Sequence, residues 1–542
     1  AVVLVLVLAL AYWWFHPAIN IQSIDLWGFL VVILALVTFV LFVFRQIYQT
    51  GMGKREKSPK KVKLFSGLMA IPIAIAVIGA VGWLASQSFF PGNAEKYSTV
   101  LVTEDADFAT DIPEVNYSEI PFIDKDSAIL LGNRTMGTMA DYVSQFEISD
   151  LYSQINYKGQ PVRVSPLNYA DFFKWWANKD GGIPAYVIVN MSTQDTEIVR
   201  LENPIRYSDS DPFFYNVDRH VQLSHPFYMF DEKSFEINDD GEPFWIYPVQ
   251  KRTIGLFGGT TIQRVVLCNA STGECQDFAI EDVPQWVDRA YPAELLIEQY
   301  NWSGALSGGW INSWLGQNGV KQTTPSTDGK SGFNYIAQDD DVWVYSGVTS
   351  ATADNSIIGC VMINQRTAES KFYSVAGATE ESAMRSAEGQ VQHLQYDATF
   401  PLLINVDGQP TYFMALKDAA GLVKMYAMVD IQRYQNVAVG DTLAATEKSY
   451  KQLLVSQGIN AGGSDASAHP SAGSTSGTIA SISPVVLDGN SHYYLILDGQ
   501  QAIFDCPVAS VVDVVRYKVG DVIVLNHGSS EGNVVLVDSI GE

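Results

Sequence analysis

The chain has little cysteine and little positive charge for its length. Only four of its 542 residues are cysteine, and 34 lysines and arginines stand against 59 aspartates and glutamates, for a formal net charge of −25. Four cysteines in so long a chain exclude a disulfide-rich scaffold. An acidic chain repels nucleic acid and other anionic polymers, so we expect no nucleic-acid partner.

Motifs of common metal sites are also missing, since there is no HExxH and no CxxC. The segment 324–331 imitates a phosphate-binding loop, but Thr324 replaces its first glycine and a strand is predicted to follow. His220 and His225 are five residues apart, a spacing that favours structural histidines over paired ligands. We predict a protein that is not an enzyme, with no catalytic residue, cofactor or metal; a dispersed Ser-His-Asp triad stays open.

Hydrophobic residues are concentrated at the N-terminus. Runs of about 18 or more apolar residues predict membrane-spanning helices, because a helix satisfies its own backbone polar groups in hydrocarbon. We therefore predict that residues 1–90 are a membrane anchor with three transmembrane helices. They correspond to three runs without a charged residue: 1–15, 26–44 and 64–90.

The first of these runs is short and begins at Ala1, so we interpret it as a truncated span. A signal peptide is the alternative. Trp13 and Trp14 favour the span, because they are typical of an aromatic belt at a membrane interface.

The loops predict the orientation of the helices. Residues 45–63 carry seven lysines and arginines and one glutamate, whereas residues 16–25 carry no lysine or arginine. Positive loops stay cytoplasmic, so we predict a multi-pass protein of the cell membrane with residues 91–542 extracytoplasmic. The same loop is expected to contact anionic lipids through Lys54, Arg55, Lys57, Lys60, Lys61 and Lys63.

The acidic charge lies in the predicted external region. Residues 1–90 carry a net +5, which leaves −30 on residues 91–542. This charge keeps an exposed domain soluble and attracts cations or basic partners. The acidic clusters 238–241 and 339–341 lack the spacing of a calcium loop and are interpreted as turns.

Two cysteines bracket a turn in the segment VVLCNASTGECQDF. Asn269 suits the start of a four- or five-residue hairpin turn, and Gly273 suits its positive-φ position. If Asn269 faces Glu274, then Cys268 faces Cys275 across the strands, within disulfide reach. We predict a Cys268–Cys275 disulfide; a buried thiol pair and a metal pair are the alternatives.

The same turn recurs. Asn-x-x-Thr follows an apolar run at residues 190–193, 269–272 and 364–367. Residues 412–428 keep the strand–turn–strand outline, with Gly421 aligned to Gly273 and Lys417 at the asparagine position. This repetition predicts duplicated β-rich units.

Helices are predicted between the hairpins, which makes the external region α+β. Their segments are 167–180, opened by Ser165-Pro166; 283–302, preceded by Asp282 and divided at Pro292; 380–394, capped by Thr379; and 442–457, capped by Asp441. Trp175 and Trp176 in the first of these are candidates for a partner-binding surface. A core stripe is the favoured interpretation of such dense aromatics.

A helix followed by three strands with an NxxTGE-like turn resembles the PepSY module. More broadly, residues from about 127 to about 457 resemble an uncharacterised family of Firmicute multi-pass membrane proteins with a large PepSY-like extracellular region. The stretches that carry the resemblance are INYKGQPVRV, RTIGLFGG, VAGATEESAM and FPLLINVDGQPTYFMALKDAAGLVKMYAMV. The resemblance implies location and modularity, and it supplies no chemistry.

The external region is predicted to divide into five parts. They are an extracellular stalk (91–165), two α+β PepSY-like regions (166–330 and 331–458), a Gly/Ser/Ala linker (459–477) and a C-terminal all-β OB-like small barrel (478–542). The barrel carries Arg516 and Lys518 against eight acids, which argues for an interaction or assembly role. A bond between Cys506 and Cys360 would dock the tail on the body, whereas Cys360 also suits an apolar core position.

These features predict a non-catalytic, membrane-anchored cell-envelope protein whose acidic ectodomain mediates protein–protein interaction or self-assembly. Its expected partners are membrane lipids and either a second copy or another envelope protein. The alternatives are a transporter or channel subunit with an extracellular cap, and a regulator of a surface peptidase. The spans contain no charged residue of the kind that marks an ion path, which argues against the first of these.

Overall fold

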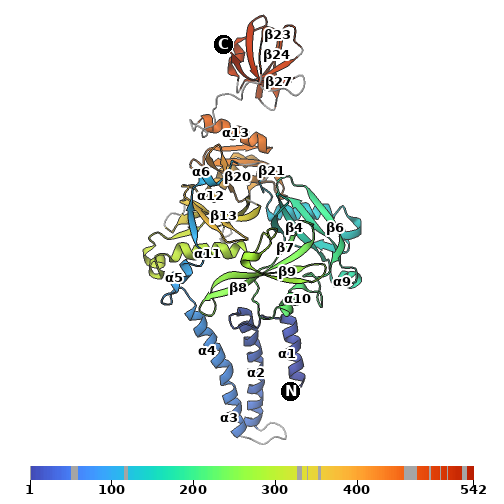
Figure 1. Cartoon of the computed structure of the whole chain (residues 1–542), viewed down its shortest axis with the longest axis vertical. Helices are drawn as coiled ribbons and strands as arrows, with labels where there is room; N and C mark the ends of the chain where they lie inside the picture. Colours follow the sequence, from blue (N-terminus) through green and yellow to red (C-terminus); the bar gives the residue numbers. More distant parts are fainter. Residues whose placement is uncertain are drawn as a thin grey trace. The chain divides into compact units, whose positions relative to one another are not determined.

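The structure, a computed structural model, forms two compact units, residues 1–461 and 462–542 (Figure 1). It describes residues 2–50, 59–114, 120–325, 332–338, 340–351, 356–456, 473–487, 490–500, 502–508, 511–527 and 534–541. Lys54, Arg55, Lys57 and residues 459–472 of the predicted linker lie outside these ranges.

Four helices form the N-terminal part: α1 (Val2–Phe15), α2 (Ile24–Thr50), α3 (Pro59–Leu68) and α4 (Ala70–Ala85). Residues 24–50 and 60–85 are long and apolar enough to cross a membrane. Helix α1 has 14 residues, and at about 1.5 Å per residue it is shorter than a hydrocarbon core of about 30 Å. Helices long enough to span a membrane are therefore found for two of the three predicted runs, and the first run, predicted as a truncated span, forms a shorter apolar helix.

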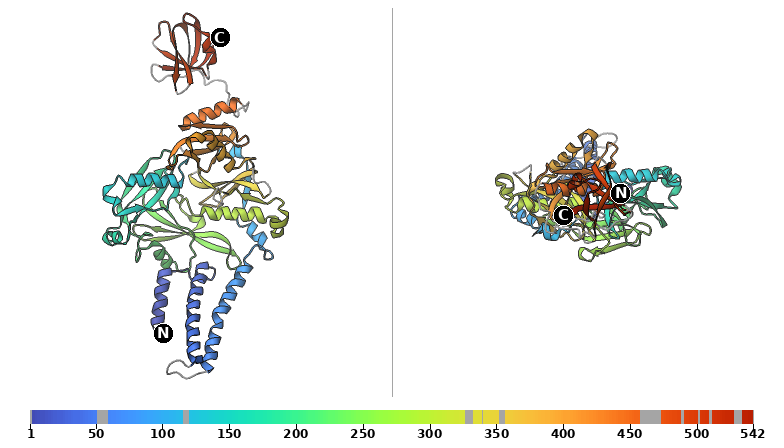
Figure 2. Two further views of the ribbon diagram at one scale, coloured as in Figure 1. Left: turned by 180° about the vertical axis from the view of Figure 1, so that it is seen from behind. Right: turned by 90° about the horizontal axis from the view of Figure 1, so that it is seen from above.

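Helices α2 and α3–α4 form a hairpin, held near its loop by the ring of Phe65 against Phe44 and Tyr48, at 6.0 and 5.8 Å between centroids. Lys61 lies there as well, with Nζ 4.6 Å from the Tyr48 ring centroid. Figures 1 and 2 show the end of α2 and the start of α3 at the end of the helices farthest from the β-rich body. The described ends of the basic segment, residues 45–50 and 59–63, thus lie at the opposite end of the predicted spans from the body.

Four largely antiparallel sheets make up the β-rich body. The first has the order β2-β4-β5-β6 with β3 beside β4, and the second has the order β10-β9-β8-β7. Their strands are β2 (Phe146–Ile148), β3 (Ser153–Tyr157), β4 (Gln160–Tyr169), β5 (Ile183–Asn190), β6 (Thr196–Ile205), β7 (Ser234–Ile237), β8 (Pro243–Ile254), β9 (Gly258–Asn269) and β10 (Cys275–Ala279).

The third sheet has the order β1-β16-β15-β13-β11 with β12 beside β13, and the fourth has the order β18-β20-β21-β22 with β19 beside β20. A separate pair joins β14 to β17. The strands are β1 (Thr103–Ala106), β11 (Lys321–Thr323), β12 (Asn334–Gln338), β13 (Asp341–Ser350), β14 (Ser356–Ile357), β15 (Gly359–Asn364), β16 (Ser370–Tyr373), β17 (Gly377–Ala378), β18 (Asp397–Ala398), β19 (Leu402–Val406), β20 (Gln409–Lys417), β21 (Val423–Asp430) and β22 (Val437–Gly440).

Short helices connect and cover the sheets, so the α+β prediction agrees with this unit. They are α5 (Asn93–Ser98), α6 (Phe108–Asp111), α7 (Lys125–Met136), α8 (Ala140–Val143), α9 (Phe172–Asn178), α10 (Val217–Ser224), α11 (Ala293–Leu306), α12 (Glu380–Gln390) and α13 (Leu443–Ser456). Thr379 caps α12 as predicted, by accepting the Ser382 N–H at Oγ1. Helix α13 is capped by Thr442 instead of Asp441, because the Thr442 hydroxyl accepts the Ala445 N–H.

Two predicted helix starts are wrong. The first helix was predicted to begin at residue 167, but β4 extends to Tyr169. Helix α9 begins only at Phe172. On one edge of β4, the residues before Pro166 pair with β3 and the residues after it pair with β2. Pro166 lies between the two groups, so its missing N–H interrupts neither of these ladders. In the second case, the helix predicted from residue 283 begins at Ala293, directly after Pro292.

The predicted turns are confirmed at all three Asn-x-x-Thr sites. The side chains of Asn190, Asn269 and Asn364 each accept the N–H groups two and three residues ahead, at 2.8–3.0 Å. The residue four positions after each asparagine has positive φ, and at the second turn it is Gly273, with φ 77°. In the fourth turn, Lys417 was predicted at the asparagine position. The residue that accepts the turn N–H groups is instead the next one, Asp418.

The predicted internal boundaries of the external region do not match the structure. Residues 91–165 are no stalk, since they supply β1 to the third sheet and β2, β3 and most of β4 to the first. The predicted boundary between residues 165 and 166 falls inside β4. The predicted boundary between residues 330 and 331 separates β11 from the other strands of the third sheet. One hydrophobic cluster extends from Ile120 to Leu454, which makes the body a single packed unit.

The second unit is a closed barrel of five strands in the order β23-β24-β25-β27-β26. They are β23 (Gly473–Leu487), β24 (Asn490–Leu497), β25 (Ile503–Pro507), β26 (Val522–His527) and β27 (Val534–Gly541). Residues 473–477 of the predicted linker therefore belong to a strand. Residues 512–516, which include Arg516, form a 3-10 helix in the region predicted to be all-β.

Candidate functional site

The β-rich body is fixed to the end of helix α4 through the tip of the β8–β9 hairpin. Ser86 follows α4, and its Oγ accepts the N–H groups of Leu256 and Phe257 at 2.8 and 3.0 Å. The Tyr97 hydroxyl donates to the Ser86 carbonyl at 2.8 Å. These buried hydrogen bonds join the anchor to the body without a flexible segment.

Helix α10 makes a second connection, to the end of α1. Arg219 Nε donates to the carbonyl oxygen of Trp13 at 3.0 Å, and its guanidinium carbon lies 4.1 Å from the centroid of the Trp13 ring. The same guanidinium also donates to the carbonyl of Phe213. A buried cation is thus satisfied by backbone carbonyls and an aromatic face.

A cavity of about 620 Å³ lies between these two connections. Its wall combines the α1–α2 connection and the start of α2, including Asp25, with polar groups of the body, among them Asp218, Lys233 and Arg252. Lys233 Nζ lies 2.8 Å from both Asp209 and Asp218. Burial opposes the charge on Lys233, but the two carboxylates prevail and raise its pKa. Lys233 and Asp218 of this wall are paired with each other, which suits a structural role, whereas Arg252 Nε is buried without a hydrogen-bond partner.

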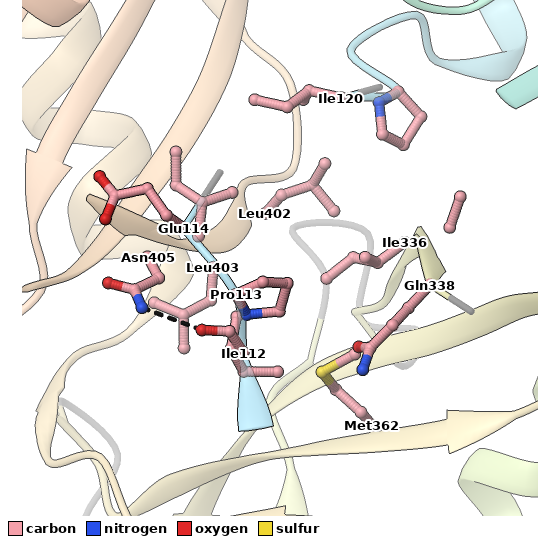
Figure 3. Close-up of a pocket in the computed structure, with 13 residues that line it drawn as sticks. Ile112, Pro113, Glu114, Ile120, Ile336, Gln338, Met362, Leu402, Leu403 and Asn405 are labelled. Carbon is pink, nitrogen blue, oxygen red and sulfur yellow. Dashed lines mark hydrogen bonds between the residues drawn. The ribbon is translucent and has the colours of Figure 1, made fainter. Parts of the chain in front are cut away.

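A second, smaller pocket of about 130 Å³ lies where residues 112–114 pass between β12 and β19 (Figure 3). Figure 3 shows apolar side chains such as Ile336, Met362 and Leu403 around it. Asn405 donates from Nδ2 to the Ile112 carbonyl at 2.9 Å, and its Oδ1 is buried without a partner. Ligand pockets usually exceed about 300 Å³, so this volume suits one small apolar group.

The two cysteines of the β9–β10 hairpin lie as the sequence predicted, with Cys268 directly opposite Cys275. Asn269 and Glu274 close the turn with a 2.9 Å hydrogen bond. The predicted disulfide is not present, because both residues are free thiols. The Cys275 sulfur instead interacts with a histidine from helix α10.

That histidine is His220. Its ligand nitrogen and the two sulfurs all lie within 4.8 Å of one another. Hydrogen bonding to the Cys268 thiol, and then to His220, lowers the pKa of Cys275 to about 5. The same contact with Cys275, together with burial, raises the pKa of Cys268. Of the two sulfurs, Cys275 therefore has the lower pKa and Cys268 the higher one.

The structure separates the two predicted tryptophans. Trp175 is buried, and its Nε1 donates to Asp211 at 2.6 Å, whereas Trp176 is 63% exposed. Phe172 and Phe173 on the same helix are exposed as well. Trp175 thus belongs to the core, and an aromatic surface surrounds Trp176.

Cys360 and Cys506 are free thiols, each buried in the hydrophobic core of its own unit. Cys360 occupies the apolar core position that the repeat predicted. The structure therefore gives no support to a bond between them.

Sequence reasoning missed His220 and Arg219 as site residues. The two cysteines already singled out needed a third ligand to bind a metal, and that need was the signal for His220. However, His220 lies 48 positions before Cys268 in the sequence. Only the placement of α10 against the hairpin brings them together. Arg219 gave no local signal, because its partners lie on α1 and on the loop before α10.

Comparisons with known proteins identify no relative: no protein-family description and no curated protein matches the chain. Among solved structures, a Synechocystis apocarotenoid oxygenase variant is 10% identical over 57% of this chain and 67% of its own, with a TM-score of 0.17. A B. megaterium levansucrase variant is 9% identical over 82% of this chain and 97% of its own, with a TM-score of 0.18. At such TM-scores neither likeness supports a shared fold or chemistry.

Proposed function

We propose that the chain is a non-catalytic, membrane-anchored cell-envelope protein whose extracytoplasmic body binds another protein chain. The observation that carries the proposal is the aromatic surface of helix α9. Phe172, Phe173 and Trp176 are 51, 79 and 63% exposed, while Trp175 between them is buried. Exposed aromatic clusters on a rigid element are typical of protein-binding surfaces.

Sidedness supports this proposal. Residues 45–50 and 59–63, the described ends of the basic loop, lie at the opposite end of the predicted spans from the body, and a lysine- and arginine-rich loop favours the cytoplasmic side. The family resemblance with PepSY-like proteins would place the body outside the cell as well. Protease added to intact, right-side-out cells should then digest the body, whereas inside-out vesicles should protect it; the reverse pattern would refute the topology.

The C-terminal unit supports an assembly role. Its barrel closes in the strand order β23-β24-β25-β27-β26. A 3-10 helix lies between β25 and β26 in the sequence. This connectivity resembles an OB-like barrel. Arg516 and Lys518 do not make a basic stripe, so a protein suits its surface better than nucleic acid.

The test is site-specific photo-crosslinking in intact cells. A photoreactive amino acid at position 173 should capture a second polypeptide, either another copy or a different envelope protein. The matched control is position 134, an exposed arginine on α7. Equal yields at the two positions, or adducts with lipid alone at position 173, would contradict a protein-binding surface on α9.

A further inference from the structure

We propose that His220, Cys268 and Cys275 form a binding site for one thiophilic transition-metal ion, Zn(II) or Cu(I). The site goes beyond the proposed protein-binding role and uses different residues. Two thiolates and an imidazole are the donor set that such ions prefer.

The distances require little rearrangement. The three donor atoms already lie within 4.8 Å of one another. Around a tetrahedral zinc ion with bonds of 2.0–2.3 Å, donor atoms are separated by about 3.3–3.8 Å. Rotations of the side chains by about 1 Å or less at the donor atoms would complete the site, without movement of the backbone.

The scaffold holds the donors from two directions. Cys268 and Cys275 are paired across β9 and β10, and the turn between them is fixed by Asn269 and by Gly273 in its positive-φ conformation. His220 Nε2 lies 2.8 Å from the carbonyl oxygen of Gly273, which orients the ring over the hairpin. If Nε2 keeps this hydrogen bond, Nδ1 is the ring nitrogen that would bind the ion, and a carbonyl contact of this kind is a usual outer contact of a metal-binding histidine.

A metal ion coordinates cysteine as the thiolate, so binding would release the protons of Cys268 and Cys275. Cys268 is fully buried and Cys275 is half-buried, and the bound cation would neutralise the two sulfurs.

Access and coordination number fit as well. Cys275 and His220 are half-buried, so an ion reaches the donors from solvent. Three protein donors complete a trigonal Cu(I) site, whereas Zn(II) would add a water or a partner's side chain as its fourth ligand. A disulfide between the same two cysteines is the competing state, and it would exclude the ion.

The test uses the full chain, purified in mild detergent and kept reduced under argon. Zn²⁺ and Cu⁺ are titrated separately against chromophoric chelators of known affinity. We expect one equivalent of one of these ions to bind per chain, with about tenfold or greater loss of affinity in His220→Gln and complete loss in Cys275→Ser. The ion that binds more tightly than its chelator identifies the metal.

His393→Gln is the matched control, because it removes an exposed histidine of the 3-10 helix 392–394, which lies outside the three-donor group, and it should leave affinity unchanged. Circular dichroism of each variant shows whether it is folded, and the bound ion should raise the melting temperature of the unaltered chain but not of Cys275→Ser. Equal affinity in unaltered protein and His220→Gln would overturn the site. So would a stoichiometric Cys268–Cys275 disulfide, detected by mass spectrometry, in protein taken from membranes without reductant.

Discussion

Arg219 donates from Nε to the backbone carbonyl of Trp13 at 3.0 Å, and its guanidinium lies over the Trp13 ring. The two residues are 206 positions apart, on helices α10 and α1. This contact fixes the first helix to the body independently of the hydrogen bonds at Ser86, so the body is held at two separate points.

Substituting Arg219 tests this connection. In Arg219→Gln the carbonyls of Trp13 and Phe213 lose their charged donor, and charged hydrogen bonds contribute about 1.5–3 kcal/mol each. We expect a melting temperature lower by several degrees, measured by tryptophan fluorescence in detergent. Arg134→Gln, on an exposed helix face, is the control; equal melting temperatures for the two variants would refute the role of Arg219.

A second prediction concerns the ion pair that joins helix α7 to strand β20. Asp124 accepts the Ser127 N–H at 2.9 Å as a helix cap and lies 2.5 Å from Lys417 Nζ. Burial acts against ionisation, but Lys417 and Ser127 outweigh it and lower the pKa of Asp124.

Because the pKa of Asp124 is lower in the folded state, its contribution to stability is complete above its ordinary value of about 3.9 and is lost as pH falls through the folded value. Asp124→Asn should reduce the free energy of unfolding at pH 7 by about 1–3 kcal/mol. The difference from the unaltered protein should shrink in acid. Denaturant unfolding at pH 7 and near pH 3 measures it, and a constant difference would contradict the assignment.

A third prediction compares two glycines that both have positive φ. Gly159, with φ 75°, has no atom within 4 Å of an added Cβ, whereas at Gly273 the Tyr207 ring would lie 2.3 Å from it. Gly159→Ala should lower the free energy of unfolding by only about 1–2 kcal/mol, from backbone strain. Gly273→Ala adds an overlap typically worth about 1–3 kcal/mol. Equal losses in thermal unfolding would show that the Tyr207 contact is unimportant.

A fourth prediction concerns two buried carboxyl groups, Glu236 and Asp288. Burial, and then the neighbouring Glu236, raises the pKa of Asp288 well above its ordinary value. A raised acid pKa in the folded state means that stability is greatest below the unfolded value, about 3.9, and declines as pH rises toward the folded value.

Asp288→Asn removes this titration while keeping an oxygen acceptor for the Asn156 N–H, which Asp288 accepts at 2.7 Å. We therefore expect the variant to have a higher melting temperature than the unaltered protein at pH 8 and a similar one near pH 4. A variant that is destabilised equally at both values would show that Asp288 acts through packing or hydrogen bonding instead of charge.

Local chemistry explains which structural features were predictable. The turns at Asn190, Asn269 and Asn364 depend on one side chain bonding to N–H groups two and three residues ahead, so the sequence alone predicts them. The opposition of Cys268 and Cys275 follows from the length of the turn between them. Apolar runs likewise predicted the two long membrane helices, because their length and composition are local properties.

The unpredicted features depend on contacts distant in sequence. Ser165-Pro166 is typical of a helix start, but β4 is paired on both sides by segments whose positions the sequence does not reveal. His220 joins the two cysteines only because α10 packs against the hairpin. The free state of those cysteines was not predictable either, since the argument for a disulfide did not include a histidine as a competing partner.

Arg219 and His220 are consecutive residues of an eight-residue helix. One contacts the end of helix α1, and the other contacts the turn of the cysteine hairpin. Because a short helix behaves as a rigid rod, a pull on the hairpin is transmitted to α1 across a single peptide bond. Mechanical load on the body would thus reach helix α1 without passing through the long sheets.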